Sequence, residues 1–117
     1  MFDINKLVFD TLKPLDIPVY FCARKENRLP VVIFNVTSER GYNYWDDEEK
    51  EVKYKVCINL FSKGNFIKHK NQILKLMRDA GFKREDVPEC IYQEDTEIFN
   101  QPVFFSYINQ LEEESSS

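Results

Sequence analysis

Apolar and mostly polar side chains alternate most clearly between Val52 and Ser62. The apolar set is Val52, Tyr54, Val56, Ile58 and Leu60, and the set between them is Lys53, Lys55, Cys57, Asn59 and Phe61. Because successive side chains of a strand point to opposite faces, this period of two predicts a strand with one buried face.

Apolar residues at helical spacing predict a first helix over about residues 3–13. Its apolar positions follow each other at steps of three and four residues, and they are Ile4, Leu7, Val8 and Leu12. Asp3 can cap the start of this helix, and Pro14 disfavours helical backbone at Lys13.

A second helix is predicted between Gly64 and Gly81. Asn65 can cap its start, and at its end Gly81 can take the left-handed conformation of a C-cap, with Phe82 making the accompanying hydrophobic contact. One side of this helix carries Phe66, Lys70, Ile73, Leu74, Met77 and Ala80. A helix with one apolar side is expected to pack on a sheet.

Two further pairs of strands are predicted from β-branched and aromatic runs. The stretch 19–22 and the nearly apolar stretch 30–36 are separated by the charged connector "ARKENRL", which suits a hairpin turn, and we expect the second of them to be central. The stretches 88–95 and 102–111 each begin with a proline and are joined by "TEIFNQ". The expected order is α-β-β-β-α-β-β, an α+β domain.

Length and composition fit one soluble domain over residues 1–111, followed by the solvated tail "EEESSS" at 112–117. Of the 117 residues 43% are hydrophobic, which is enough for a core, yet no apolar run is long enough to span a bilayer. The first residues lack the basic start and continuous apolar stretch of a signal peptide, so we expect the protein in the cytosol.

Charge and cysteine content argue against several functional classes. The net charge of −4 disfavours tight binding to nucleic acid. Cys22, Cys57 and Cys90 are odd in number and widely spaced, so we expect reduced, packed side chains and neither a disulfide framework nor a zinc site. With three glycines, no phosphate-binding loop is expected.

The acidic run at residues 46–49 raises the question of a metal site, because Mg²⁺ and Ca²⁺ prefer clustered oxygen ligands. Neighbouring side chains of an extended segment point to opposite sides, and the spacing of a calcium-binding loop is missing, so a solvated charged surface is favoured. The single histidine, His69, lies among lysines with no carboxylate or nucleophile near it in the sequence. We therefore expect no catalytic residues, no metal and no cofactor.

Two segments are candidates for protein contacts. Aromatic side chains in a polar segment are enriched at interfaces, and here they adjoin the acidic run, giving the set Tyr42, Tyr44, Trp45, Asp46, Asp47, Glu48 and Glu49. A basic counter-patch on the second helix consists of Lys68, Lys70, Lys75 and Arg78. A head-to-tail contact between the two would be heterologous, and it would close into a ring if the rotation is right.

The chain resembles the small tail-completion, or tail-terminator, proteins of long-tailed bacteriophages and prophages over nearly residues 4–109. The resemblance is carried by the order of elements and by "LDIPVYF", "LPVVIFNV", "KYKVCINLFSKGNF", "LMRDAGFKR" and "EDTEIFNQPVFFSY". It implies an α+β fold with a mainly antiparallel sheet of about four to five strands flanked by two helices. The tail "EEESSS" has no counterpart in the family pattern.

The resemblance also implies a structural role. Such proteins form a ring, commonly of six copies, at the head-proximal end of the tail tube, where they stop tube polymerisation and dock the head connector. The expected partners are other copies of the chain, the tube protein and the connector, the expected place is the neck of the virion after synthesis in the bacterial cytoplasm, and the segment 38–51 is an expected contact loop. DNA would pass through without specific binding. Alternatives are another neck protein, such as a head-completion or connector-stopper subunit, and a small acidic metal-dependent nuclease.

Overall fold

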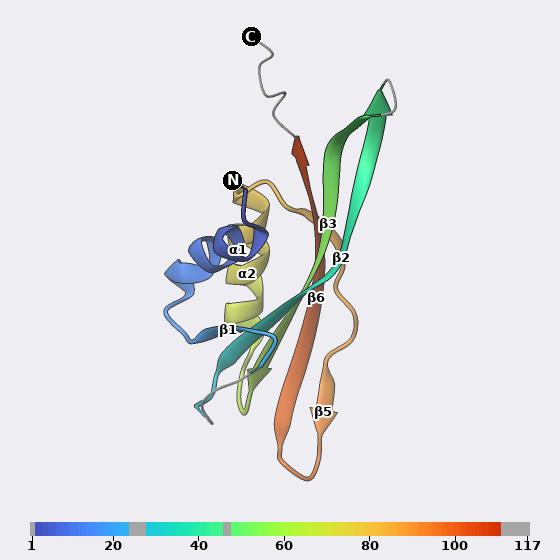
Figure 1. Ribbon diagram of the computed structural model, residues 1–117. Coiled ribbons are helices and arrows are strands. Elements are labelled where there is room, and N and C mark those ends of the chain that lie inside the picture. The colour runs from blue at the N-terminus through green and yellow to red at the C-terminus, as the bar shows by residue number, and fades with distance from the viewer. Residues whose placement is uncertain (1, 24–27, 46–47, 111–117) are drawn as a thin grey trace.

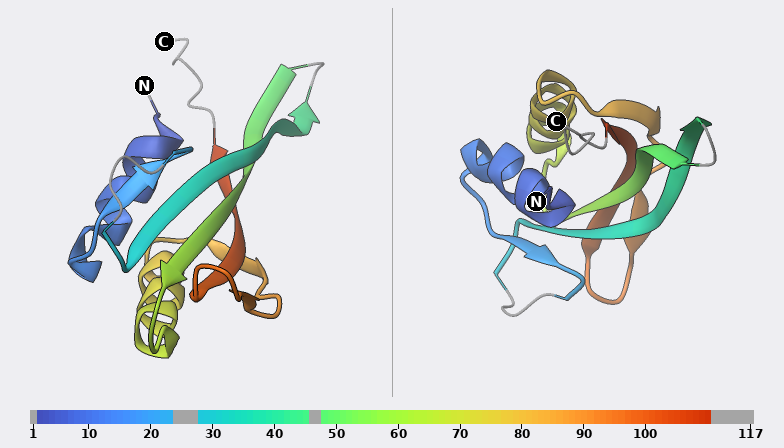
Figure 2. Two further views of the ribbon diagram at one scale, coloured as in Figure 1. Left: turned by 90° about the horizontal axis from the view of Figure 1, so that it is seen from below. Right: turned by 45° about the horizontal axis from the view of Figure 1, so that its top comes forward.

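A computed structural model describes residues 2–23, 28–45 and 48–110 of the chain. Helices α1 and α2 lie on one face of a twisted sheet (Figures 1 and 2). The elements are α1 (Ile4–Leu12), the short 3-10 helix η1 (Lys13–Leu15), β1 (Val19–Phe21), β2 (Val31–Trp45), β3 (Glu48–Ser62), α2 (Ile67–Asp79), β4 (Lys83–Asp86), β5 (Ile91–Gln93) and β6 (Ile98–Gln110). The α+β fold class predicted from the sequence is confirmed.

Strand β3 forms the centre of the sheet, as its alternating pattern allows. It pairs with β2 on one side and with β6 on the other, in the order β1-β2-β3-β6-β4, and β5 also pairs with β6. Its side chains Val56, Ile58 and Leu60 have no exposed surface and pack under the helices. They meet Ile73 and Met77 of α2, which are equally buried, so the predicted apolar side of that helix does face the sheet.

The two ends of α2 differ in how they compare with the predicted caps. The N-cap position is Phe66, one residue after the predicted Asn65, and the Phe66 side chain makes no capping hydrogen bond. Asn65 Oδ1 accepts a hydrogen bond from the Ile67 backbone N–H at 3.0 Å. At the other end of α2, Gly81 adopts φ +97°. The N–H of Gly81 donates to the Arg78 carbonyl and that of Phe82 donates to the Met77 carbonyl, both at 3.0 Å, which is the Schellman pattern. The C-cap prediction is confirmed.

The predicted hairpin between the first two strands is wrong, because β1 and β2 run parallel, with Val19 opposite Val32. The Val32 N–H donates to the Pro18 carbonyl at 2.9 Å, and the Cys22 N–H donates to the Phe34 carbonyl at 3.0 Å. A charged connector favours a loop but does not fix the direction in which the chain returns. Strand β2 is also less central than expected, since β1 covers it only from Val32 to Phe34.

The structure describes six strands in the sheet, more than the four to five expected. Strand β4 was not predicted since its four residues, "KRED", are all exposed and give no apolar signal. Strand β5 is confined to Ile91–Gln93, and β6 begins at Ile98, four residues before the predicted start. The joining segment "TEIFNQ" is therefore partly strand, because its apolar residues pair with β5.

Candidate interaction surfaces

The segment 38–51, predicted to be a contact loop, is the outer part of a long β-hairpin. Strands β2 and β3 continue their antiparallel pairing through Tyr42–Glu51, Tyr44–Glu49 and Trp45–Glu48. The loop prediction is wrong. It gave most weight to the acidic run, whereas the neighbouring tyrosine and tryptophan are residue types that favour strands. Five of the seven predicted contact residues, Tyr42, Tyr44, Trp45, Glu48 and Glu49, have strand backbone, and Asp46 and Asp47 lie outside the described residues.

The hairpin extends past the rest of the sheet (Figure 1). Among the described residues, strand β6 accompanies β3 as far as Gln110, which pairs with Glu51. We call residues 42–45 and 48–51 the hairpin overhang. Beyond the pair Tyr42–Glu51 the described backbone of the overhang is a ribbon of two strands.

The predicted basic counter-patch on α2 does not form one surface. Lys68, Lys75 and Arg78 are exposed, whereas Lys70 is half-buried. Successive helical residues are about 100° apart, so Lys70 lies about 200° around the helix from Lys68, on the side of Ile73 and Met77. The patch is therefore corrected to three residues, with the Arg78 Nε 3.6 Å from the Asp79 carboxylate.

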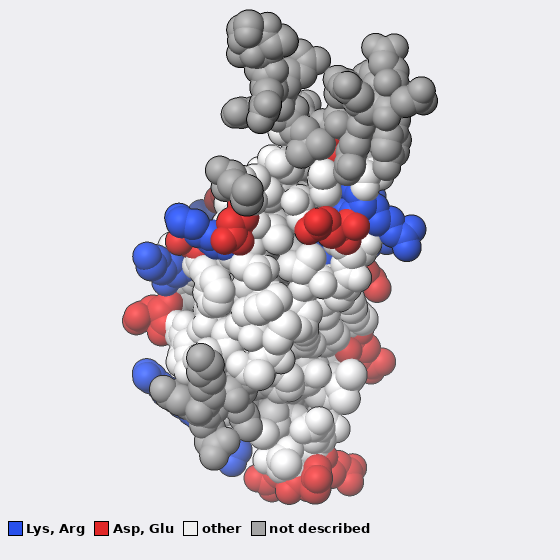
Figure 3. All heavy atoms as spheres, viewed as in Figure 1, with Lys and Arg blue, Asp and Glu red and all other residues white. Residues whose placement is uncertain are grey.

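Other charged side chains gather around the end of α2 and at the opposite end of the molecule. A hollow of about 440 Å³ beside the end of α2 is lined by Leu74, Arg78, Phe82, Lys83 and Arg84. The turn between β5 and β6 carries the exposed carboxylates Glu94, Asp95 and Glu97, and red atoms mark the lower end of the molecule in Figure 3. The surface across the middle of that view is mostly uncharged.

The open face of the sheet carries a second hollow, of about 330 Å³. Its lining mixes both charges with aromatic rings and consists of Thr37, Lys53, Lys55, Glu85, Asp86, Phe104 and Phe105. Within it the Ser106 Oγ donates to the Glu85 carboxylate at 2.5 Å. This hydrogen bond holds β4 against β6, because Glu85 lies in β4 and Ser106 in β6.

The candidate reactive groups are not gathered into a site. Among the described residues, no three His, Cys, Asp or Glu side chains lie close enough together to hold a metal ion. Burial raises the pKa of the Cys57 thiol and of the Cys90 thiol, which lowers the thiolate fraction that a nucleophile needs. Cys57 is packed as predicted, but Cys22 is exposed, contrary to the expectation that all three pack.

No protein-family model matches the chain, and a search of curated proteins gave no match. None of the helices among the described residues is long and apolar enough to cross a membrane.

Proposed function

We propose that the chain is a structural subunit of a bacteriophage or prophage tail. Copies of it form a ring, with six as the expected number, at the head-proximal end of the tail tube. The ring ends tube polymerisation and joins the tail to the head connector, so its site of action is the neck of the virion. This proposal rests on the resemblance of the sequence and on one structural observation, the hairpin overhang.

The overhang supports a contact role because of how strands are stabilised. A ribbon of two strands is at best marginally stable in water, and a third strand or a packing partner is needed to hold it. Beyond the pair Tyr42–Glu51, no third strand among the described residues accompanies the hairpin. The segment also contains Tyr44 and Trp45, residue types that dominate the energetics of protein interfaces. We infer that the tail tube or a neighbouring subunit supplies the missing partner.

The charge of the chain fits a passage for DNA. A ring around the DNA path has to let phosphates slide past, and a net charge of −4 per copy repels them at short range. A strongly basic lumen would instead bind the backbone through released counterions. In this proposal the chain carries out no reaction, and it requires no cofactor or metal.

The test is complementation of a phage that lacks the gene, with variants of the overhang. Trp45→Ala and Tyr44→Ala are expected to give tails of abnormal length and few joined particles, counted by electron microscopy. Tyr92→Ala is the matched control, because Tyr92 is an aromatic residue of β5, 47% exposed and outside the overhang. Normal tails with both overhang variants would contradict the proposed role of the overhang, and absence of the protein from purified virions would overturn the function.

Two alternatives lead to different results in the same system. A head-completion or connector-stopper subunit would remain bound to tail-less heads, whereas a terminator remains bound to head-less tails. A metal-dependent nuclease would cleave DNA with Mg²⁺ or Mn²⁺, and Asp46→Ala would abolish the cleavage.

A further inference from the structure

Two strand edges at the same end of the sheet have no partner strand within the part of the chain that the structure describes. Strand β1 pairs with β2 no further than Phe34, and β4 pairs with β6 no further than Ser106. From Asn35 onward on β2, and from Tyr107 to Gln110 on β6, no strand among the described residues lies on the outer side. Both edges belong to the three-stranded ribbon β2-β3-β6, one on each side of it (Figure 2).

Backbone hydrogen bonds to β1 fix which groups of β2 face outward. In an antiparallel strand the N–H and C=O of one residue point to the same side, and alternate residues point to opposite sides. The groups of Val32 and Phe34 bond the β1 side. Phe34 is opposite Ile58, so the groups of Ile58 face β6, and Lys55, three residues earlier, faces β2.

The ladder beyond the bulge at Thr37 follows from Lys55. Its carbonyl accepts a hydrogen bond from Thr37 Oγ1 at 3.3 Å, which agrees with its facing β2. Lys53 then faces β2 as well, and its partner there is Arg40. Since Arg40 faces inward, its neighbours Glu39 and Gly41 present their N–H and C=O groups to the outside.

The same counting gives the outer edge of β6. Ile58 faces β6 and is paired with Val103, so Val103 faces inward and the outward residues are the even-numbered ones. Phe104 and Ser106 are among them, and both are paired with β4. Pro102, which has no N–H, also falls at an outward position, in the gap between the β5 and β4 pairings. The next two outward residues are Ile108 and Gln110.

These two edges match each other as a parallel pair. Strands β2 and β6 both run antiparallel to β3, so they run parallel to one another, and copies related by rotation about an axis along the strands keep that direction. In a parallel ladder, a residue facing the partner strand bonds the two residues that flank the position opposite it. Ile108 is level with Lys53, and Lys53 is level with Arg40. Ile108 of one copy therefore meets Glu39 and Gly41 of the next without any shift along the strands.

We infer that copies of the chain join edge to edge, the outer edge of β6 in one copy pairing with the outer edge of β2 in the next. The Ile108 N–H donates to the Glu39 carbonyl of the neighbouring copy, and the neighbouring Gly41 N–H donates to the Ile108 carbonyl. A contact between two different edges is heterologous, and it closes into a ring when the rotation between copies is right. The inference rests on the proposed ring and names the contact that closes it.

An open strand edge can pair with strands of unrelated proteins, and both edges carry features that disfavour such pairing. The bulge at Thr37 interrupts the β2 edge between Val36 and Ser38, so only the stretch after it continues a regular ladder. Arg40 and Glu39 place exposed charges beside it, which disfavours stacking of unrelated flat edges. On β6, Pro102 removes a donor from the part of the edge that lies between β5 and β4.

Disulfide trapping tests the register directly. Ile108→Cys and Arg40→Cys are combined in one chain in which Cys22, the exposed native cysteine, is replaced by serine. Mild oxidation of purified protein and of purified virions is expected to give a ladder on a non-reducing gel that ends at the closed ring. The control chain carries Ile91→Cys with Arg40→Cys, because Ile91 is 54% exposed and lies on β5, away from the proposed edge. A ladder from the control alone, or from neither chain in both preparations, would overturn the inference.

A proline variant tests the hydrogen bond. Ile108→Pro removes the outward N–H, and the native Pro102 shows that β6 accepts proline at an outward position. Oligomers are expected to be lost in native mass spectrometry across concentrations, whereas Ile108→Val keeps them. Circular dichroism confirms folding, and if the proline variant does not fold, the trapped register decides. If the disulfide forms in solution but the protein is absent from virions, the proposed function is overturned and the edge contact is kept. If the protein is found at the neck but no disulfide forms, the edge contact is overturned and the proposed function is kept.

Discussion

The Gln101 side chain ties the segment before β5 to the buried strand β6. Its Nε2 donates to the Pro88 carbonyl at 2.8 Å and to the Pro102 carbonyl at 2.9 Å. Gln101 itself is only 3% exposed. It thereby bridges the gap in which the outer edge of β6 has neither β4 nor β5 beside it.

Replacing Gln101 by leucine is expected to destabilise the fold. Both carbonyls would lose a donor inside the protein, and each buried group left without one costs about 1–3 kcal/mol. Urea denaturation should show a loss of about 2 kcal/mol in the free energy of unfolding, because the two proline carbonyls are only partly buried. Gln93→Leu, on the exposed strand β5, should unfold at the midpoint of the native protein. An unchanged midpoint for Gln101→Leu would show that the two bonds contribute nothing.

Gly81 and Gly64 offer a matched comparison of backbone strain. Gly81 has φ +97°, and a Cβ added there would lie 3.7 Å from Tyr107 Cε1, an ordinary contact. The cost of Gly81→Ala is therefore conformational, about 1–2 kcal/mol for an L-residue with left-handed backbone. Gly64→Ala places its Cβ in open space, and we expect a change within about 0.5 kcal/mol. Equal thermal unfolding of the two variants would argue against the C-cap role of Gly81.

The sequence predicted features that depend on residues near each other in the chain. Asp3, Gly81 and the alternation in β3 are such local signals, and the structure has each of them. The parallel direction of β1 and the existence of β4 depend on which distant strand lies alongside, and the pattern of a single short segment does not encode this. The aromatic and acidic residues of the overhang were recognised by type, but their backbone conformation was not.

The open strand edges could not be predicted from the sequence either, because they depend on which distant strands lie alongside. Ile108 does not differ in type from residues inside a sheet, and the charged residues Glu39 and Arg40 lie in the segment that was expected to be a loop. An edge exists only because β1 and β4 end where they do, and these lengths become known from the pairing register. Pro102 was a local sign on β6, since proline within a strand indicates a position that faces away from the ladder.

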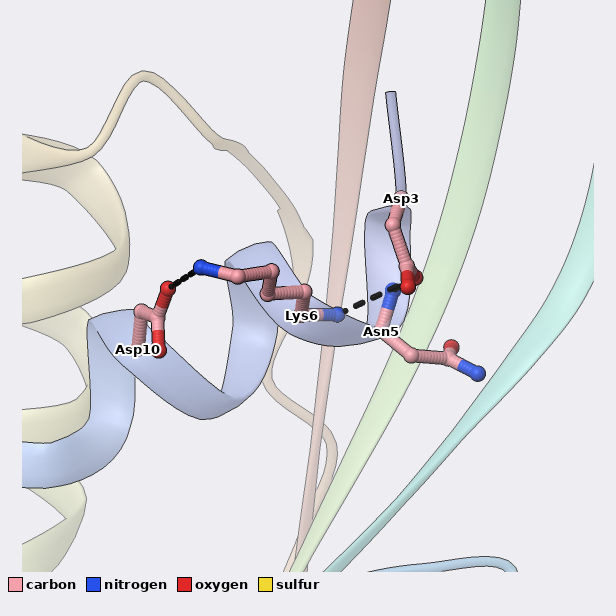
Figure 4. Close-up of polar contacts among 4 residues, drawn as sticks. All are labelled: Asp3, Asn5, Lys6 and Asp10. Atoms are coloured by element: carbon pink, nitrogen blue, oxygen red, sulfur yellow. Dashed lines mark hydrogen bonds and ion pairs between the residues drawn. The ribbon is translucent and has the colours of Figure 1, made fainter. Parts of the chain in front are cut away.

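Asp3 is expected to contribute to stability through α1 alone. Its Oδ1 accepts hydrogen bonds from the backbone N–H groups of Asn5 at 3.0 Å and Lys6 at 3.2 Å (Figure 4). Asp3→Ala should lower the free energy of unfolding by about 1 kcal/mol, the typical value of an N-cap. Asp3→Asn keeps an accepting oxygen and should behave like the native protein in the same denaturation experiment. If both variants are equally destabilised, the charge of Asp3 matters more than its hydrogen bonds.

The Glu85 carboxylate is expected to make the docking of β4 sensitive to acid. The hydrogen bond from Ser106 holds the pKa of Glu85 below its ordinary value, and Lys83 adds to the effect. A carboxylate whose pKa is lower in the folded state stabilises the fold above the pKa of the unfolded chain, about 4.3 for glutamate. That stabilisation is lost as the pH falls through the folded pKa.

Carbon NMR of the Glu85 carboxyl group during an acid titration measures its pKa in the folded protein directly. Ser106→Ala is expected to move the pKa of Glu85 upward, because the donor that favours the charged carboxylate is gone. The same variant should lose less stability than the native protein between pH 7 and pH 3, since less of its stability depends on an ionised Glu85. Glu94→Gln removes an exposed carboxylate from the β5–β6 turn and should leave the titration of Glu85 unchanged. A pKa that stays low in Ser106→Ala would assign the shift to the surrounding lysines instead.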